Sequence, residues 1–314
     1  MRDLQQRLIA QSLDISPDTL GHYGPGTAGA VRRFQESRRL RLDGTCGQQT
    51  WSALVEAGYR LGDRLLYLRQ PMLRGDDVAA LQRHLGALGF DAGRVDGIFG
   101  IDTKVALDEF QRNAGLTVDG VCGRDTVRAL ERLSARRGDR EPVAAVREVE
   151  RLRQAPRTLE GKRVAVGHGG GLHAAVTAAA RFLTGAGADV TVLEHPDQSA
   201  QAAEANTAGV DVYVGLLLDP RADGCRTAHY AGHRYESPGG RRLARMIQAT
   251  VPAALGVPDG GVRGMALPVL KETRMPAVLC ELGPAPQIVP RTAELAAALG
   301  EALSDWAAAP LDED

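Results

Sequence analysis

The sequence predicts a multidomain protein, with two small all-α three-helix modules followed by an α/β domain whose mainly parallel sheet is flanked by helices. The chain has 314 residues, which exceeds the usual size of one domain. Its first 134 residues contain an internal repeat, and beyond residue 160 short apolar runs alternate with helical patterns. We expect module 1 at residues 1–58, module 2 at 63–134, a charged linker at 135–160 and the α/β domain at 161–308.

The composition argues against several classes of protein. There are 38 basic and 39 acidic residues, for a net charge of -1, so the basic excess of a nucleic-acid-binding protein is missing. No apolar stretch approaches the roughly 18–20 uncharged residues of a transmembrane segment. The four cysteines are far apart, which does not indicate a disulfide framework, and we expect them to be reduced and mostly buried.

The internal repeat is defined by two segments that match at an offset of 76 residues. LDGTCGQQTWSAL (42–54) matches VDGVCGRDTVRAL (118–130), and Phe34-Gln35 falls on Phe110-Gln111. At an offset of 77 residues, Leu4-Gln5 falls on Leu81-Gln82. The first unit departs from the second at Leu20, which stands where the second unit has Asp96.

Each repeat unit is predicted to form three short helices joined by turns. In the second unit, the first helix has an apolar stripe formed by Val78, Leu81, Leu85 and Leu88. The second helix is expected to bury Val105, Leu107 and Phe110. Asp-Gly dipeptides predict the intervening turns, and Asp102 or Thr103 is expected to cap the second helix.

The helix and turn pattern of both units resembles the peptidoglycan-binding repeat found on bacterial wall hydrolases. The resemblance implies that peptidoglycan or its precursors are the binding partner. We interpret the Gly, Asp and Thr positions of the motif as turn and cap positions rather than ligand contacts. Aromatic residues make up 4% of the chain, so stacking platforms for sugars are scarce and the substrate-binding residues stay unknown.

Beyond the charged linker, which includes a possible short helix at 143–152, strand and helix signals alternate. Strands are predicted at 163–167, 189–193, 210–218 and 277–282, with 224–230 as an edge strand; helices are predicted at 172–184, 199–206, 238–247 and 292–305. Ligand sites of parallel sheets lie at the carboxyl ends of strands. His168 follows the first of these strands and Glu281 closes the last, while Cys280 is expected to point into the core. We interpret the remaining histidines of this domain, His195, His229 and His233, as surface or loop residues.

Several segments of this domain resemble the zinc-dependent N-acetylmuramoyl-L-alanine amidases. VAVGHGG (164–170) resembles their first strand and zinc-histidine loop. AEANTAGVDVYVG (203–215) resembles the helix and strand before the second zinc histidine, and RGMALPVLKETRMPAVLCELG (263–283) resembles the closing motif. The resemblance implies that His168 is a zinc ligand and Glu281 the general acid/base, and that a metal-bound water attacks the lactyl amide.

The sequence departs from the amidase pattern at two zinc-ligand positions. Leu217 stands where the family has its second zinc histidine, and leucine cannot ligate a metal. The helix after the histidine loop also has no acid where the family has its liganding glutamate. His173, five residues after His168, and Asp219, on the strand face of Leu217, are possible substitutes, so a site of His168, His173 and Asp219 is one alternative.

These departures lead to two hypotheses about function. The first is a pseudoenzyme, a non-catalytic peptidoglycan-binding or regulatory protein without a cofactor. It resembles actinobacterial amidase-like regulators, which contact a protein of peptidoglycan synthesis. In this hypothesis His168 is a relic held in its loop, and Glu281 is held by backbone donors or by an arginine such as Arg263. The alternative is an active zinc amidase that hydrolyses the bond between N-acetylmuramic acid and L-alanine.

The N-terminal segment bears on localisation. MRDLQQRLIA contains no apolar core after its basic start, which predicts a cytoplasmic protein without a secretory signal. The first repeat unit begins abruptly, however, because Met1 stands at the place of Val78 in the second unit. This favours a natural polypeptide that starts upstream and a truncated module 1. A secreted or cell-wall-associated protein is therefore the alternative.

Overall fold

The structure is a computed structural model that describes residues 1–134, 143–232 and 235–311. The chain divides into two compact units, built mainly from Met1–Arg147 and from Glu148–Gly232 with Glu236–Asp314. The first unit holds the helical modules and the second holds the α/β domain, which confirms the predicted fold class. Among the described residues, no helix is both long and apolar enough to cross a bilayer.

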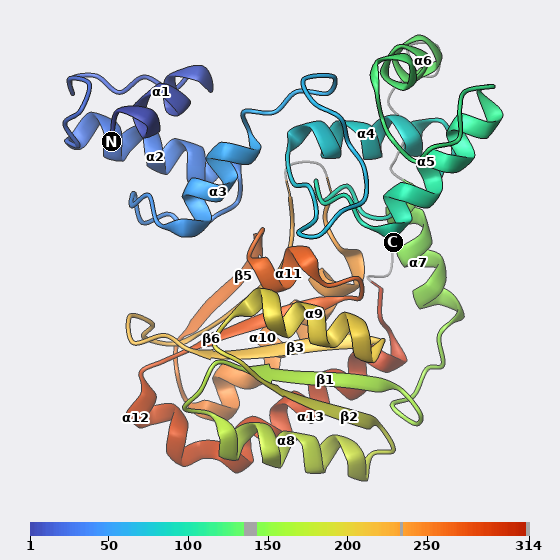
Figure 1. Cartoon of the computed structure of the whole chain (residues 1–314). Helices are drawn as coiled ribbons and strands as arrows, with labels where there is room; N and C mark the ends of the chain where they lie inside the picture. Colours follow the sequence, from blue (N-terminus) through green and yellow to red (C-terminus); the bar gives the residue numbers. More distant parts are fainter. Residues whose placement is uncertain (135–142, 233–234, 312–314) are drawn as a thin grey trace. The chain divides into compact units, whose positions relative to one another are not determined.

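Both helical modules have the predicted architecture. The helices of the first are α1 (Arg2–Ala10), α2 (Pro25–Ser37) and α3 (Gln48–Glu56), and those of the second are α4 (Asp76–Ala87), α5 (Ile101–Asn113) and α6 (Arg124–Ser134) (Figure 1). The core of the second module includes Leu81, Leu85, Leu107 and Phe110. The expectation for Val105 was wrong, because its side chain lies on the outer face of α5 and is 47% exposed.

A buried glutamine organises the turn between α4 and α5. Gln82 Nε2 donates to Asp96 Oδ1 at 2.9 Å, to the Ile98 carbonyl at 3.1 Å and to Thr103 Oγ1 at 3.2 Å. Its Oε1 accepts from the backbone N–H groups of Asp96 and Gly97. Thr103 therefore binds Gln82 within the turn and does not cap α5. The N-cap residue of α5 is Gly100, and no side chain forms a capping hydrogen bond there. We call this arrangement a glutamine hub.

The glutamine hub recurs at the equivalent position of each turn. Gln111 Nε2 donates to Asp119 Oδ1 and Thr126 Oγ1. Gln35 Nε2 donates to Asp43 Oδ1 and Thr50 Oγ1 in the same way. Gln5 forms a variant hub, in which Nε2 donates to the carbonyls of Thr19 and His22 and to Thr27 Oγ1. Leu20 replaces the hub aspartate there, and Asp18 instead accepts from the backbone N–H groups of Gly24 and Thr27.

The second half of the predicted linker is integral to the α/β unit. Helix α7 (Val143–Gln154) places Glu148 at 1% exposure and Leu152 in the core of that unit. Glu148 Oε1 accepts from Ser237 Oγ at 2.5 Å and from Gly239 N at 3.1 Å. Leu159 is buried in the same core, ahead of the first strand.

A six-stranded sheet forms the middle of the described part of the α/β unit. Its strands are β1 (Arg163–His168), β2 (Asp189–Glu194), β3 (Val212–Leu218), β4 (Cys225–Tyr230), β5 (Asp259–Met265) and β6 (Ala277–Leu282). They lie in the order β2-β1-β3-β6-β4-β5, and every neighbouring pair is parallel except β4 with β6. Two strand predictions fail here: β4 is interior rather than an edge, and the edge strand β5 was not predicted.

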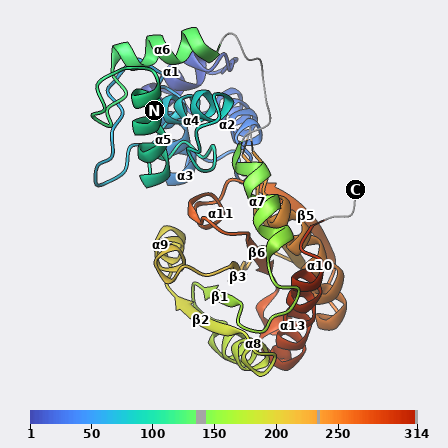
Figure 2. The ribbon, with the colours of Figure 1, turned by 90° about the vertical axis from the view of Figure 1, so that its right-hand side faces the viewer.

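Helices cover both faces of the sheet (Figures 1 and 2). The lower face in Figure 1 packs on α8 (His173–Gly185), α10 (Pro238–Leu255) and α13 (Thr292–Ala308). Val164, Val166 and Val214 belong to this core, which we call the α8 face. The opposite face meets α9 (Gln198–Ala208) and α11 (Pro268–Glu272), and we call it the α9 face. The short α12 (Ala285–Ile288) and a 3-10 turn at Val289–Arg291 precede α13.

Candidate metal and acid sites

A group of possible metal ligands lies at the carboxyl ends of β1 and β2. His168 and Glu194 are the last residues of these strands and are paired in register, and His173 opens α8 after a glycine turn. One ligand atom from each side chain lies within 4.8 Å of the others. His173 Nδ1 is 3.5 Å from Glu194 Oε2, and His168 Nε2 is 4.0 Å from the same oxygen. Gly170 and Gly171 have φ values of +117° and +75°, a backbone conformation that residues with a Cβ atom rarely adopt.

The hydrogen bonds of His168 define which of its ring nitrogens carries the proton. Its side chain is buried, and Gly170 N donates to Nδ1 at 3.1 Å. A neutral ring that accepts at Nδ1 holds its proton at Nε2. Within the described residues, Nε2 has no hydrogen-bond partner. His168 therefore presents an N–H toward Glu194, at a distance too long for a hydrogen bond.

The residue types of this group suit a divalent metal, but the hydrogen bonding of His168 in this structure does not. Two imidazoles and a carboxylate are ligands that zinc accepts, and a fourth position would stay open. A histidine that binds a metal through Nε2 usually donates its Nδ1 proton to a neighbour. Here Nδ1 accepts a hydrogen bond, so metal binding requires the Gly170 N–H to turn away. The flexible glycines of the loop permit that movement.

The remaining positions of the expected amidase centre lie on the other face of the sheet. The register pairs His168 with Leu216 and Leu216 with Cys280, whereas Leu217 pairs with Glu281. Paired residues project from the same face, and successive residues of a strand alternate between faces. His168 thus lies on the α8 face with Cys280, and Glu281 lies on the α9 face with Leu217.

Glu281 has an arginine neighbour. The residue is 3% exposed, and Arg226 Nη1 lies 3.6 Å from its Oε2. Arg226 is in register with Glu281 across the antiparallel β4–β6 pair. Arg263 was the wrong candidate for this role, because it lies on the edge strand β5, separated from β6 by β4.

The other predicted positions are dispersed. Asp219 lies after β3, where its Oδ1 accepts from Arg221 N at 2.9 Å, and it is not part of the group formed by His168, His173 and Glu194. His195 is half-buried in the loop after β2. His229 is not a surface residue: it lies within β4, is 3% exposed, and its Nε2 contacts Glu236 Oε1 at 2.6 Å. The interpretation of His233 concerns a residue outside those that the structure describes.

Glu194 is the site residue that sequence reasoning missed. The segment DVTVLEH gives a usable signal, because its acid follows an apolar strand that lies next to the strand of His168. Carboxyl ends of neighbouring parallel strands meet at one edge of a sheet. That rule identified His168 and Glu281 and applies equally to Glu194.

Comparisons with known proteins agree with this organisation. Residues 1–54 and 74–130 match the family described as putative peptidoglycan binding domain. Residues 157–286 match the family described as N-acetylmuramoyl-L-alanine amidase. The two helical modules and the α/β unit therefore have separate family matches, in the order that the internal repeat and the strand pattern predicted.

Individual relatives extend the match. The chain is 38% identical over 284 residues to the N-acetylmuramoyl-L-alanine amidase CwlM of Mycobacterium tuberculosis, covering 81% of this chain and 70% of that one. It is 30% identical over 154 residues to the amidase CwlL of Bacillus licheniformis, covering 42% and 43% of the two chains. A solved amidase from Clostridium difficile 630 aligns with 47% of this chain and 97% of its own, with 20% identity and a TM-score of 0.40. The chain belongs to the N-acetylmuramoyl-L-alanine amidase family, and two peptidoglycan-binding domains precede its amidase domain.

Proposed function

We propose that this protein is a non-catalytic peptidoglycan-binding or regulatory protein whose α/β domain keeps the amidase fold without amidase chemistry. The observation that carries the proposal is the strand register, which places Leu217 beside Glu281 on the α9 face and His168 on the α8 face. An acid acts on a metal-bound reactant only from hydrogen-bonding distance. A metal held at His168, His173 and Glu194 is separated from Glu281 by the sheet.

The described ion pair of Glu281 supports the same proposal. Arg226 supplies a positive neighbour for the carboxylate at 3.6 Å, so Glu281 has a structural role that does not require a metal. Glu281 is buried while Arg226 is partly exposed, and removing the charged neighbour of a buried carboxylate is costly, which gives a reason to keep both residues without catalysis. The tandem modules then provide contacts with peptidoglycan or its precursors, and the α/β domain is free to contact a protein of peptidoglycan synthesis.

Hydrolysis and binding assays on the full chain test this proposal together. The purified protein is supplied with Zn²⁺ and incubated with peptidoglycan, beside an active amidase of the family as positive control. We expect the protein to sediment with insoluble peptidoglycan and to release no free stem peptide. Release of stem peptide that is abolished in Glu281→Gln contradicts the proposal.

The alternative function is a zinc amidase with a rearranged centre. The observation that favours it is the group of His168, His173 and Glu194, whose ligand atoms lie within 4.8 Å of one another. The same assay distinguishes the two functions when it includes Glu194→Gln. An enzyme of this kind loses both its bound zinc and its activity in that variant, whereas the non-catalytic protein has no activity to lose.

A further inference from the structure

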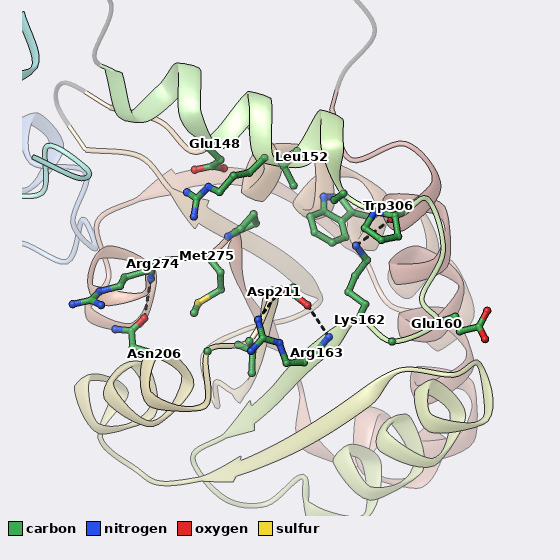
Figure 3. A pocket seen from close by; sticks show the side chains of 17 residues that line it. Glu148, Leu152, Glu160, Lys162, Arg163, Asn206, Asp211, Arg274, Met275 and Trp306 are labelled. Atoms are coloured by element: carbon green, nitrogen blue, oxygen red, sulfur yellow. Dashed lines mark hydrogen bonds and ion pairs between the residues drawn. The ribbon is translucent and has the colours of Figure 1, made fainter. Parts of the chain in front are cut away.

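A cavity of about 380 Å³ lies within the α/β unit at the end of the sheet opposite to His168 (Figure 3). Residues at or just before the amino ends of three strands line it: Arg163 for β1, Asp211 for β3 and Pro276 for β6. Its volume lies within the range of small-molecule sites, roughly 300–1,000 Å³. The cavity is distinct from the groups at the carboxyl ends of the strands.

Contacts between three helices hold one wall of the cavity in place. Glu148 on α7 accepts from Gly239 N, and Trp306 Nε1 on α13 donates to the Gly239 carbonyl at 3.0 Å. Leu152 packs so closely on Gly239 that an added Cβ there would lie 2.6 Å from Leu152 Cδ1. Because α7, α10 and α13 meet at one glycine, this wall is formed before any ligand arrives.

Lys162 places a buried positive charge on the cavity wall. The residue is 8% exposed, and its Nζ lies 5.7 Å from the ring centroid of Trp306 (Figure 3). Nζ donates to the Pro156 carbonyl at 3.3 Å. Within the described residues, no carboxylate lies within 4.0 Å of this ammonium group, so two of its three donors are available. Burial lowers the pKa of Lys162, and the nearby Asp211 opposes that effect.

The other charges of the cavity leave a positive excess. Asp211 is paired with Arg163 through Nη2 at 3.3 Å and through the backbone N–H at 2.9 Å. Glu148 is engaged with the start of α10, and the Glu160 side chain points away from the cavity (Figure 3). Arg151 and Arg274 also line the cavity, and neither has a carboxylate partner among the described residues. Four cations, Arg151, Lys162, Arg163 and Arg274, therefore line the cavity against three carboxylates, which leaves the lining with one excess positive charge.

We propose that this cavity binds a small organic phosphate, with the phosphate held by Lys162 and the arginines and the apolar part packed on Met275 and Pro276. A phosphate offers more acceptor oxygens than a carboxylate, so it can accept from the remaining donors of Lys162 and from an arginine at the same time. Lysine and arginine are the side chains that recognise phosphate most often. Met275 and Pro276 are buried and supply the apolar wall.

Isothermal titration calorimetry with the full chain tests the proposal, with phenyl phosphate as the probe. Benzoate, phenol and inorganic phosphate are the comparison ligands, because each lacks one feature of the probe. We expect phenyl phosphate to bind at least about tenfold more tightly than each of them, since a lost charged hydrogen bond or apolar contact is worth that much. Lys162→Met should weaken phenyl phosphate binding by about tenfold or more.

Two further variants complete the experiment. Lys104→Met makes the same substitution on α5, outside the cavity, and should bind phenyl phosphate as the parent protein does. Arg274→Gln removes a cation at the rim and should weaken binding without disturbing the buried wall. Failure of phenyl phosphate to bind at millimolar concentration overturns the proposal, as does undiminished binding by Lys162→Met. Equal binding of inorganic phosphate also overturns it, because the apolar wall would then contribute nothing.

Discussion

His168 is the last residue of β1 and Glu281 the next-to-last residue of β6, and the strand register places their side chains on opposite faces. His168 shares the α8 face with Leu216 and Cys280, and Glu281 shares the α9 face with Leu217. A one-residue difference in register moves a side chain to the other face of a sheet. The short path from β1 into the glycine loop keeps His168 within the strand, so the retained histidine and the retained glutamate do not converge on one reactant.

Restoring the missing histidine alone should therefore fail to restore hydrolysis. Leu217→His places an imidazole on the α9 face beside Glu281, but His168 and Glu194 stay on the α8 face. Three ligands from one side are needed to bind zinc in its usual tetrahedral geometry. We expect no release of stem peptide by this variant in the presence of Zn²⁺. Substantial hydrolysis by Leu217→His would show that His168 reaches the α9 face.

The sequence predicted the helical modules well because local signals define them. Turn dipeptides, an apolar stripe and a repeated Phe-Gln pair are all short-range features. The role of Gln82 was missed, since a glutamine on an amphipathic helix is usually solvated, and only the folded turn brings Asp96 and Thr103 to its amide. Val105 was misplaced because the buried face of α5 is narrower than the apolar pattern suggests.

The α/β domain was predicted less completely for two physical reasons. Strand β5 has the sequence DGGVRGM, whose glycines and charge give no strand signal, and it forms through pairing with β4. His229 is buried by tertiary packing that its local sequence does not show: it is in register with the buried Val278 of β6, where α10 packs on β4. The face on which His168 lies depends on where β1 ends, and strand ends are poorly defined by local sequence.

The glutamine hub should be a major source of stability for the second helical module. Gln82→Ala removes the Oε1 acceptor of the Asp96 and Gly97 N–H groups and one of the two donors to the Ile98 carbonyl, which also accepts from Gly100 N. Buried polar groups without a partner are costly, so we expect a loss of about 3 kcal/mol in the free energy of unfolding. Urea unfolding followed by far-UV circular dichroism measures it. Gln48→Ala, at an exposed position, should change stability by less than about 0.5 kcal/mol.

Helix α7 should depend on Glu148 for its attachment to the α/β unit. The carboxylate accepts from Ser237 Oγ and Gly239 N at the start of α10, where the helix dipole favours a negative charge. Glu148→Ala should lower the free energy of unfolding by about 2 kcal/mol. Fluorescence of Trp306 reports the unfolding of this unit when Trp51, the other of the two tryptophans in the chain, is replaced by phenylalanine. Glu150→Ala, on the exposed side of α7, is the matched control, and an equal loss there would contradict the prediction.

His229 should make the α/β unit less stable as the pH falls. Burial lowers its pKa from the ordinary value of 6.5, Arg241 and Arg245 act in the same direction, and the hydrogen bond with Glu236 opposes them. The unfolded chain then binds the proton more readily than the folded chain does, so protonation favours unfolding. The stabilising contribution is complete above pH 6.5 and is lost as the pH falls through the lower, folded pKa.

Replacement of His229 should remove that part of the pH dependence. We expect the free energy of unfolding of His229→Gln, measured through Trp306 in the Trp51→Phe background, to decline less between pH 7 and pH 5 than that of the parent protein, by about 1 kcal/mol or less for a single group. His173→Gln, measured with a chelator present, is the control, because its side chain is 72% exposed. Parallel pH profiles for His229→Gln and the parent would mean that the folded chain binds this proton as readily as the unfolded chain does. In that case the buried contact with Glu236 would fully offset the desolvation of the imidazolium.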